Sequence, residues 1–149
     1  MPVTATPVFA QAVNFGKVAI TAANTKSDGS GTVATDIFLL ATAGANGSFF
    51  EDVRFSFGAS SAATATTATV GRVYIASTNT GALTAGTNSW LLGEVYMPSQ
   101  TADSTNAATT AFSVPIYRKI PSGLYILVST HHAPAANTSV HATLSGEDF

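Results

Sequence analysis

The sequence contains no cysteine and few charged residues. A chain without cysteine has no disulfide, no thiolate zinc site and no cysteine nucleophile, and it is compatible with both reducing and oxidising compartments. Only 9% of the residues are Asp, Glu, Lys or Arg, against roughly a quarter in an ordinary soluble domain. The 6 basic residues are scattered along the chain. No basic stripe is present to neutralise phosphates, so we expect no nucleic-acid partner.

Long apolar runs are also missing. No stretch approaches the roughly 18 consecutive apolar residues that a membrane-spanning helix needs, so we expect no membrane role. The opening residues, MPVTATPVFAQAVNFGK, have neither the basic start nor the apolar segment of a secretory signal. We therefore expect a protein that is made in the cytoplasm of its host and is not exported.

Small and uncharged polar residues take the place of the missing charges. The segments Ser60–Thr69 (SSAATATTAT) and Thr101–Ala111 (TADSTNAATTA) consist almost entirely of Ser, Thr, Asn and Ala. Such a surface loses little hydration when another protein packs against it, because few ions must be desolvated. The composition therefore indicates a component of an assembly rather than an enzyme. We expect a symmetric homo-oligomer, a homotrimer in preference to a homodimer.

Eight short strands are predicted, because helical periodicity is weak and β-branched residues, Gly and Pro recur throughout. The clearest strand is DVRFSFGA from Asp52, in which Val53, Phe55 and Phe57 share one face. The run AFSVPIYRKI carries a proline, which fits a sheet edge or a bulge. The six other runs are Val13–Thr21, Thr32–Thr42, Val70–Ser77, Trp90–Met97, Leu124–Thr130 and Val140–Ser145.

Strands of this length, separated by turn sequences, predict an all-β fold. We expect an antiparallel β-sandwich of the jelly-roll kind, with two four-stranded sheets, formed by residues 13–149 as a single domain. Residues 1–12, with Pro2 and Pro7, are expected to form an extended N-terminal arm. The apolar arm residues Val3, Val8 and Phe9 are the candidate contacts with a partner.

Three histidines, His131, His132 and His141, invite comparison with a zinc site. Adjacent residues of a regular strand point to opposite faces, so His131 and His132 are not expected to face one metal ion. We interpret them as the polar end of the seventh strand. No metal ligand is predicted.

Two acidic doublets, Glu51–Asp52 and Glu147–Asp148, are the candidates for carboxylate chemistry. A glycosidase needs two carboxylates about 5–10 Å apart in a cleft, and nothing in the sequence brings these doublets together. A GxSxG nucleophile motif is absent. We therefore predict no catalytic residue, no cofactor-binding residue, no cofactor and no enzymatic activity.

A sugar-binding platform is the alternative that the aromatic residues leave open. Aromatic rings on one sandwich face could stack on carbohydrate, whereas half-buried rings with a polar tip are the more ordinary interpretation. The residues concerned are Tyr74, Trp90, Tyr96, Tyr117 and Tyr125.

The stretch AITAANTKSDGSGTVATDIFLLATAGANGS, followed by VRFSF, resembles small structural proteins of tailed bacteriophages. The resemblance continues through GRVYIAS and LLGEVYMPS to the ending KIPSGLYILVSTHH and LSGEDF. It implies a virion component, above all a capsid decoration or cement protein. Such a protein would bind the major capsid protein on the outer surface of the head and would act as a trimer or dimer. The alternative is a carbohydrate-binding host-recognition module of a fibre or spike.

Overall fold

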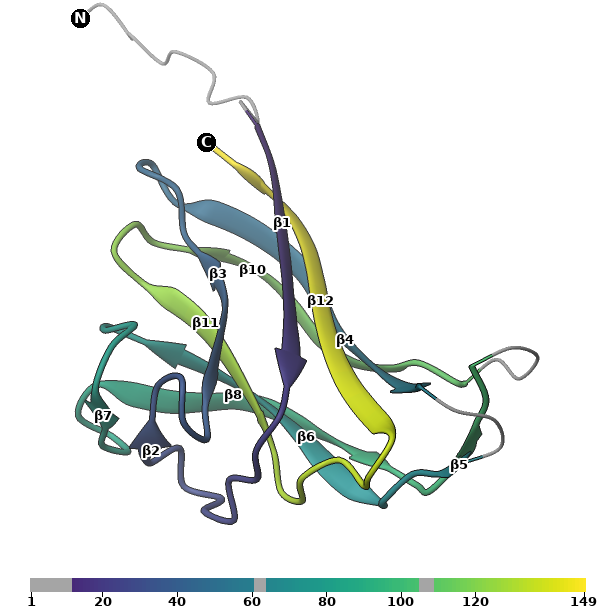
Figure 1. Ribbon diagram of the computed structural model, residues 1–149. Coiled ribbons are helices and arrows are strands. Elements are labelled where there is room, and N and C mark those ends of the chain that lie inside the picture. The colour runs from purple at the N-terminus through teal and green to yellow at the C-terminus, as the bar shows by residue number, and fades with distance from the viewer. Residues whose placement is uncertain (1–11, 61–63, 105–108) are drawn as a thin grey trace, which may run out of the picture.

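The computed structural model describes residues 12–60, 64–104 and 109–149. All the regular secondary structure in these ranges is β-strand (Figure 1). No helix in these ranges is long and apolar enough to cross a membrane. The strands are β1 (Ala12–Ile20), β2 (Gly31–Thr32), β3 (Phe38–Thr42), β4 (Ser48–Ala59), β5 (Thr64–Ala65), β6 (Thr69–Ala76), β7 (Ala82–Leu83), β8 (Ser89–Met97), β9 (Thr101–Ala102), β10 (Phe112–Ile120), β11 (Tyr125–Thr130) and β12 (Thr138–Asp148).

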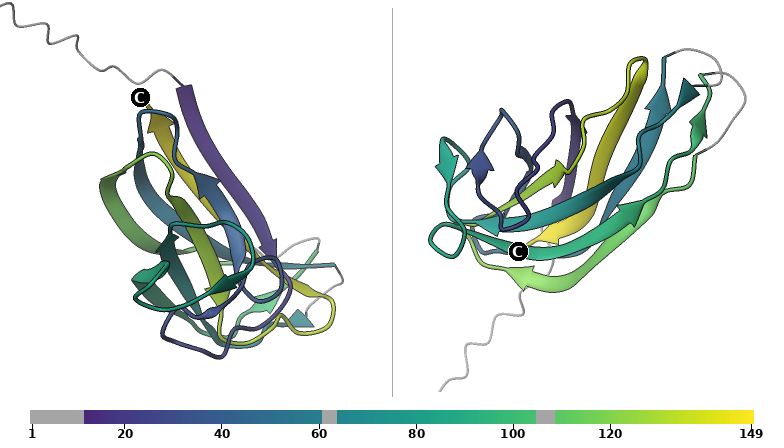
Figure 2. Two further views of the ribbon diagram at one scale, coloured as in Figure 1. Left: turned by 90° about the vertical axis from the view of Figure 1, so that its left-hand side faces the viewer. Right: turned by 90° about the horizontal axis from the view of Figure 1, so that it is seen from below.

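Eight longer strands form two four-stranded antiparallel sheets that face one another (Figures 1 and 2). Sheet I has the order β1-β12-β4-β10, and sheet II has the order β3-β11-β6-β8. The short pairs β2-β7 and β5-β9 lie at opposite sides of the sandwich (Figure 1). The predicted all-β antiparallel sandwich is confirmed.

The strand pairs are nested along the chain. β1 pairs with β12, β3 with β11, β4 with β10, and β6 with β8. Apart from the connection between β6 and β8, each connection between consecutive long strands crosses from one sheet to the other. This connectivity is compatible with the predicted jelly roll.

The core lies between the two sheets and follows the alternation that the sequence predicts. Val53, Phe55 and Phe57 of β4 are buried, and Arg54 between them is exposed. The ring of Phe55 reaches sheet II, where a Cβ placed on Gly71 of β6 would lie 3.0 Å from the ring. A side chain at position 71 would compete with Phe55 for space, which explains the glycine in the middle of β6.

β4 starts at Ser48, earlier than the predicted start at Asp52. Its pairing with β12 shifts register between Leu144 and Gly146, which leaves the Glu51–Asp52 doublet opposite Ser145. A bulge of this kind interrupts the period-2 alternation, so the residues before it do not continue the pattern that starts at Val53.

The predicted strand Thr32–Thr42 is divided into β2 and β3. The Asp36 carboxylate accepts a hydrogen bond from the Thr32 backbone N–H, and Ala34 has a φ of 65°. An aspartate that bonds the backbone within its own segment favours a turn over a sheet ladder, and this local bond overrides the β-branched composition.

β10 is an edge strand of sheet I, as the mid-strand proline predicts. The register between β10 and β4 shifts between Pro115 and Arg118, and Tyr117 in this bulge has a φ of 43°. Tyr117 is 68% exposed. A left-handed backbone at a bulky residue costs of order 1–3 kcal/mol.

Replacing Tyr117 by glycine should therefore raise the free energy of unfolding by about 1 kcal/mol, because glycine adopts this φ without strain. Urea denaturation measures the change. Tyr96 of β8 is the matched control, since it is exposed at 65% and is not among the positive-φ residues. Tyr96→Gly should lower stability, and an equal loss from both substitutions would show that Tyr117 is not strained.

The predicted arm lies almost wholly outside the described residues, and so do Val3, Val8 and Phe9. Ala12, placed at the end of the arm, is instead the first residue of β1 and pairs with Asp148. The Asp148 carboxylate accepts hydrogen bonds from the Asn14 side-chain amide, at 2.8 Å, and from the Ser48 hydroxyl. The two ends of the domain are thereby fixed to one another and to the start of β4.

Candidate binding surfaces

Among the described residues, the three histidines form no metal site. His131 and His132 follow β11, as predicted, and their rings meet edge to face with 4.5 Å between centroids. They close this strand as a polar bend, so the alternation of side chains in a regular strand does not apply to them. His131 Nδ1 lies 3.5 Å from an Arg72 guanidinium nitrogen, whereas His141 lies on β12 of sheet I.

The acidic doublets lie on neighbouring strands, because β12 pairs with β4. The inference that nothing brings them together is therefore wrong: Glu51 and Glu147 line one hollow of about 230 Å³. Both side chains are exposed. Asp148 is occupied by its bonds to Asn14 and Ser48. The sequence could not show this arrangement, since it depends on pairing between strands almost a hundred residues apart.

Arg72 forms a buried polar network on the outer side of sheet II. Its guanidinium donates to the carbonyl oxygens of Asn24 (3.2 Å) and Lys26 (3.5 Å) and pairs with Glu94 (3.3 Å). The Arg72 side chain is 6% exposed, whereas that of Glu94 is 53% exposed. Arg72 therefore fixes the loop after β1 to the sheet. This buried cation has no distinguishing sequence signal.

Tyr74 lies next to this network and is fully buried with Ile37, Leu83 and Leu127. Burial raises the pKa of Tyr74, although its hydrogen bond with Ser129 and the nearby Arg72 cation oppose that shift. The ring therefore forms part of a second, smaller core on the outer side of sheet II, beneath the β2-β7 pair, and is not available to stack on a ligand.

The aromatic platform that the sequence left open as an alternative is not formed by Tyr74, Trp90, Tyr96, Tyr117 and Tyr125, all of which the structure describes. Trp90 and Tyr96 are exposed on β8, but six residues of strand separate them by about 20 Å. Tyr117 is exposed on β10 in the other sheet, and Tyr125 is half-buried. These rings do not share one face, so they cannot stack together on one short saccharide.

One end of the sandwich is almost free of charge. Among the residues that the structure describes, it comprises 59–60, 64–69, 98–104, 109–111 and 131–139, which contain one acidic residue, Asp103, and no lysine or arginine. We call this surface the low-charge end. Backbone hydrogen bonds hold it together: the Ser60 N–H donates to the Asn137 carbonyl at 2.9 Å, and the Thr66 N–H donates to the Gln100 carbonyl at 2.8 Å. The segments that the composition singles out thus meet in space.

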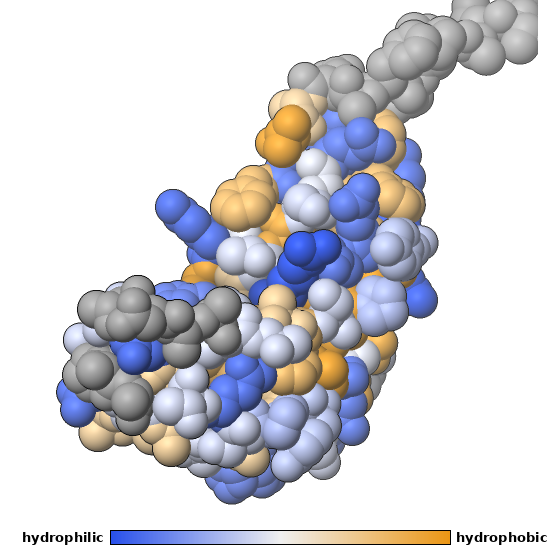
Figure 3. Space-filling view, turned by 90° about the vertical axis from the view of Figure 1, so that its right-hand side faces the viewer, coloured by the Kyte–Doolittle hydropathy of each residue, from blue (hydrophilic) through white to orange (hydrophobic). Residues whose placement is uncertain are grey.

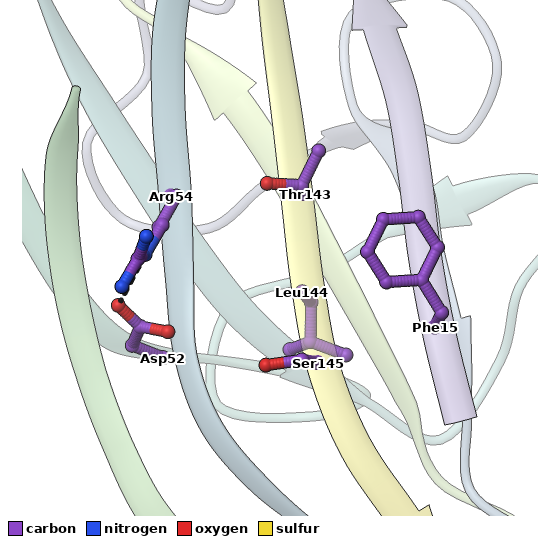
Figure 4. Close-up of a pocket in the computed structure, with 6 residues that line it drawn as sticks. All are labelled: Phe15, Asp52, Arg54, Thr143, Leu144 and Ser145. Atoms are coloured by element: carbon purple, nitrogen blue, oxygen red, sulfur yellow. Dashed lines mark hydrogen bonds and ion pairs between the residues drawn. The ribbon is translucent and has the colours of Figure 1, made fainter. Parts of the chain in front are cut away.

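The outer face of sheet I, by contrast, carries the charged residues Lys17, Glu51, Asp52, Arg54 and Glu147. Figure 3 shows this face as a mosaic of hydrophilic and hydrophobic residues. A hollow of about 260 Å³ crosses β1, β12 and β4 there, and Figure 4 shows the side chains around it. The exposed ring of Phe15 lies at one margin, and the Arg54–Asp52 ion pair, at 3.2 Å, lies at the other. Aromatic, hydroxyl and charged groups therefore surround one concave surface.

Comparison with known proteins gives no family assignment. No family model matches the chain, and no curated protein matches it. Among solved structures, the chain is similar to a chain of a structure described as the cyanophage Pam1 capsid asymmetric unit. The two chains share 16% sequence identity with a TM-score of 0.43, and the alignment covers 100% of each. A similarity of this size does not identify a function.

Proposed function

We propose that this protein is a non-enzymatic structural component of a bacteriophage virion, and more specifically a capsid decoration or cement protein. In this role it binds the major capsid protein on the outside of the head and stabilises contacts between neighbouring capsid subunits. The observation that carries the proposal is the low-charge end, and the sequence resemblance to tailed-phage structural proteins agrees with it.

The low-charge end suits permanent burial against another protein. Its surface offers Ser, Thr, Asn and Ala, and burying these groups removes few ions from water. The opposite end of the sandwich carries the β10–β11 turn around Ser122. A copy of this protein that is bound through its low-charge end leaves the outer face of sheet I in solvent. The charged residues on that face favour solubility.

Attachment is expected to be multivalent. A standard protein interface buries about 1,600 Å², and a symmetric oligomer repeats each contact, so that its total binding is much stronger than that of one copy. The proposed homotrimer or homodimer would place several low-charge ends on one lattice. A ligand that binds only the assembled lattice stabilises it by mass action.

Heads assembled without this protein should release their DNA at a lower temperature, and adding the purified protein should restore their resistance in a saturable way. A light-scattering or dye-release melt of the heads measures the difference. Binding should depend little on salt, because few ion pairs are available to be screened.

The variant Thr67→Asp/Thr110→Asp should bind heads at least tenfold more weakly, because it buries unpaired charge at the low-charge end. Both threonines are exposed, so the isolated protein should fold normally. Ser122→Asp at the opposite end is the matched control and should bind as the unmodified protein does. Equal binding by all three proteins would contradict the proposed docking surface. Adsorption to host cells without binding to heads would favour the host-recognition alternative.

A further inference from the structure

The hollow beside Phe15 continues in both directions along β12. It shares Thr143 with a hollow of about 400 Å³ that extends to His141, and it shares Ser145 with the hollow of about 230 Å³ at Glu147. His141 and Glu147 are six residues apart on one strand, a distance of about 20 Å. The three hollows therefore form one groove along β12, which we call the β12 groove.

Side-chain size explains the shape of the β12 groove. The central strand presents small residues, Thr143 and Ser145, while larger residues project from the two neighbouring strands. β1 supplies one wall along the whole groove, whereas β4 supplies the other wall at the hollows around Phe15 and Glu147 and not at the His141 end. The wall residues are Val13, Phe15 and Lys17 of β1 and Phe49, Glu51 and Arg54 of β4.

The chemistry of the β12 groove is mixed. Phe15 is 59% exposed, although removing its apolar ring from water would be favourable. Polar groups accompany it: Ser145 Oγ donates to Glu51 at 3.3 Å, and the Arg54–Asp52 pair leaves donor and acceptor groups at the surface. Two cations and three carboxylates line the whole groove, which leaves it close to neutral.

We propose that the β12 groove binds a short neutral oligosaccharide. The apolar face of a sugar ring would stack on Phe15, and its hydroxyl groups would bond with the carboxylates, the guanidinium and the hydroxyls of the walls and floor. A groove of about 20 Å accommodates several sugar units.

Other ligand classes fit less well. A peptide cannot join the sheet here, because the backbone groups of β12 are already bonded to β1 and β4 on both sides. Its own backbone would depend on side chains alone for hydrogen bonds. A nucleic acid would bring phosphates against three carboxylates. This inference goes beyond the proposed virion role and does not depend on it, since the β12 groove and the low-charge end are separate surfaces.

The probes are tetrasaccharides of glucose, mannose, galactose and rhamnose, titrated into the full chain while amide chemical shifts are followed by NMR. At least one probe should bind saturably and shift the amides of Phe15, Thr143 and Ser145. Phe15→Ala should weaken that binding about tenfold or more, by loss of the stacked ring. Tyr96→Ala is the matched control, because Tyr96 is also an exposed aromatic residue but lies on β8 of the other sheet.

Failure of every probe to shift these amides would overturn the proposal. So would equal weakening by Phe15→Ala and Tyr96→Ala, or a loss of self-association in Phe15→Ala without any saccharide binding. The last result would assign the face to contact between copies. Amide spectra that match the unmodified protein away from the substituted residue verify that both variants fold. None of these outcomes depends on the head-binding experiment, because that experiment tests a different surface.

Discussion

Phe55→Ala is expected to lower the free energy of unfolding by about 3–5 kcal/mol. Phe55 is fully buried and spans the space between the sheets, with its ring against Gly71 of β6. Because position 71 has no side chain, nothing on that strand can move into the space that the ring leaves. The substitution therefore removes buried apolar area and also leaves a cavity. Urea denaturation with two-state analysis measures the loss.

Phe15→Ala is the matched control for this substitution, since it removes the same ring from a site that is 59% exposed. Its effect on stability should be within about 0.5–1 kcal/mol. Similar losses from Phe55→Ala and Phe15→Ala would mean that the inward and outward faces of sheet I are assigned incorrectly.

Arg72→Ala is expected to lower the free energy of unfolding by about 2–4 kcal/mol, because the buried carbonyl oxygen of Asn24 and the part-buried carbonyl oxygen of Lys26 lose their donor. This loss of stability should arise in the loop after β1, which Arg72 holds to sheet II. Hydrogen exchange should show faster exchange in the loop after β1, with the Asn24 amide, which donates to the Thr130 carbonyl, as the reporter.

Arg54→Ala is the control here, because both arginines have a carboxylate partner and differ in burial. The side chain of Arg54 is 66% exposed and that of Arg72 is 6% exposed. An exposed ion pair contributes about 0–1 kcal/mol, so Arg54→Ala should have little effect. A large loss from Arg54→Ala, or none from Arg72→Ala, would contradict the buried network as the anchor of this loop.

The strands were predictable from sequence where alternation is local. The Val53, Phe55 and Phe57 pattern marks β4, and Pro115 marks β10 as an edge strand, because each signal depends on the geometry of its own segment. The prediction of Thr32–Thr42 as one strand was wrong, because the Asp36 side chain stabilises a turn that composition does not reveal.

The binding surfaces depend on strand pairing, which no local pattern contains. The segments of the low-charge end stand out in the sequence, but only the fold brings them together. The β12 groove requires β1 and β4 on either side of β12, and the burial of Arg72 requires the loop after β1 to cover sheet II. For the low-charge end, sequence reasoning could identify the residues. For the β12 groove and for the buried Arg72, it could identify neither the residues nor the site.

Nested strand pairing also determines the order in which the chain can fold during synthesis. Each of β1, β3 and β4 has its antiparallel partner in the second half of the given sequence, and β1 waits for β12, which is made after every other strand that the structure describes. The 52 residues after Met97 take roughly 3–10 s to synthesise at 5–20 residues per second. During that time β1 has no strand to pair with. Its apolar residues are exposed and can contact other nascent chains. Sheet I is therefore completed only once β12 has been made, and the pairing of β1 with residues up to Asp148 ends this period of exposure.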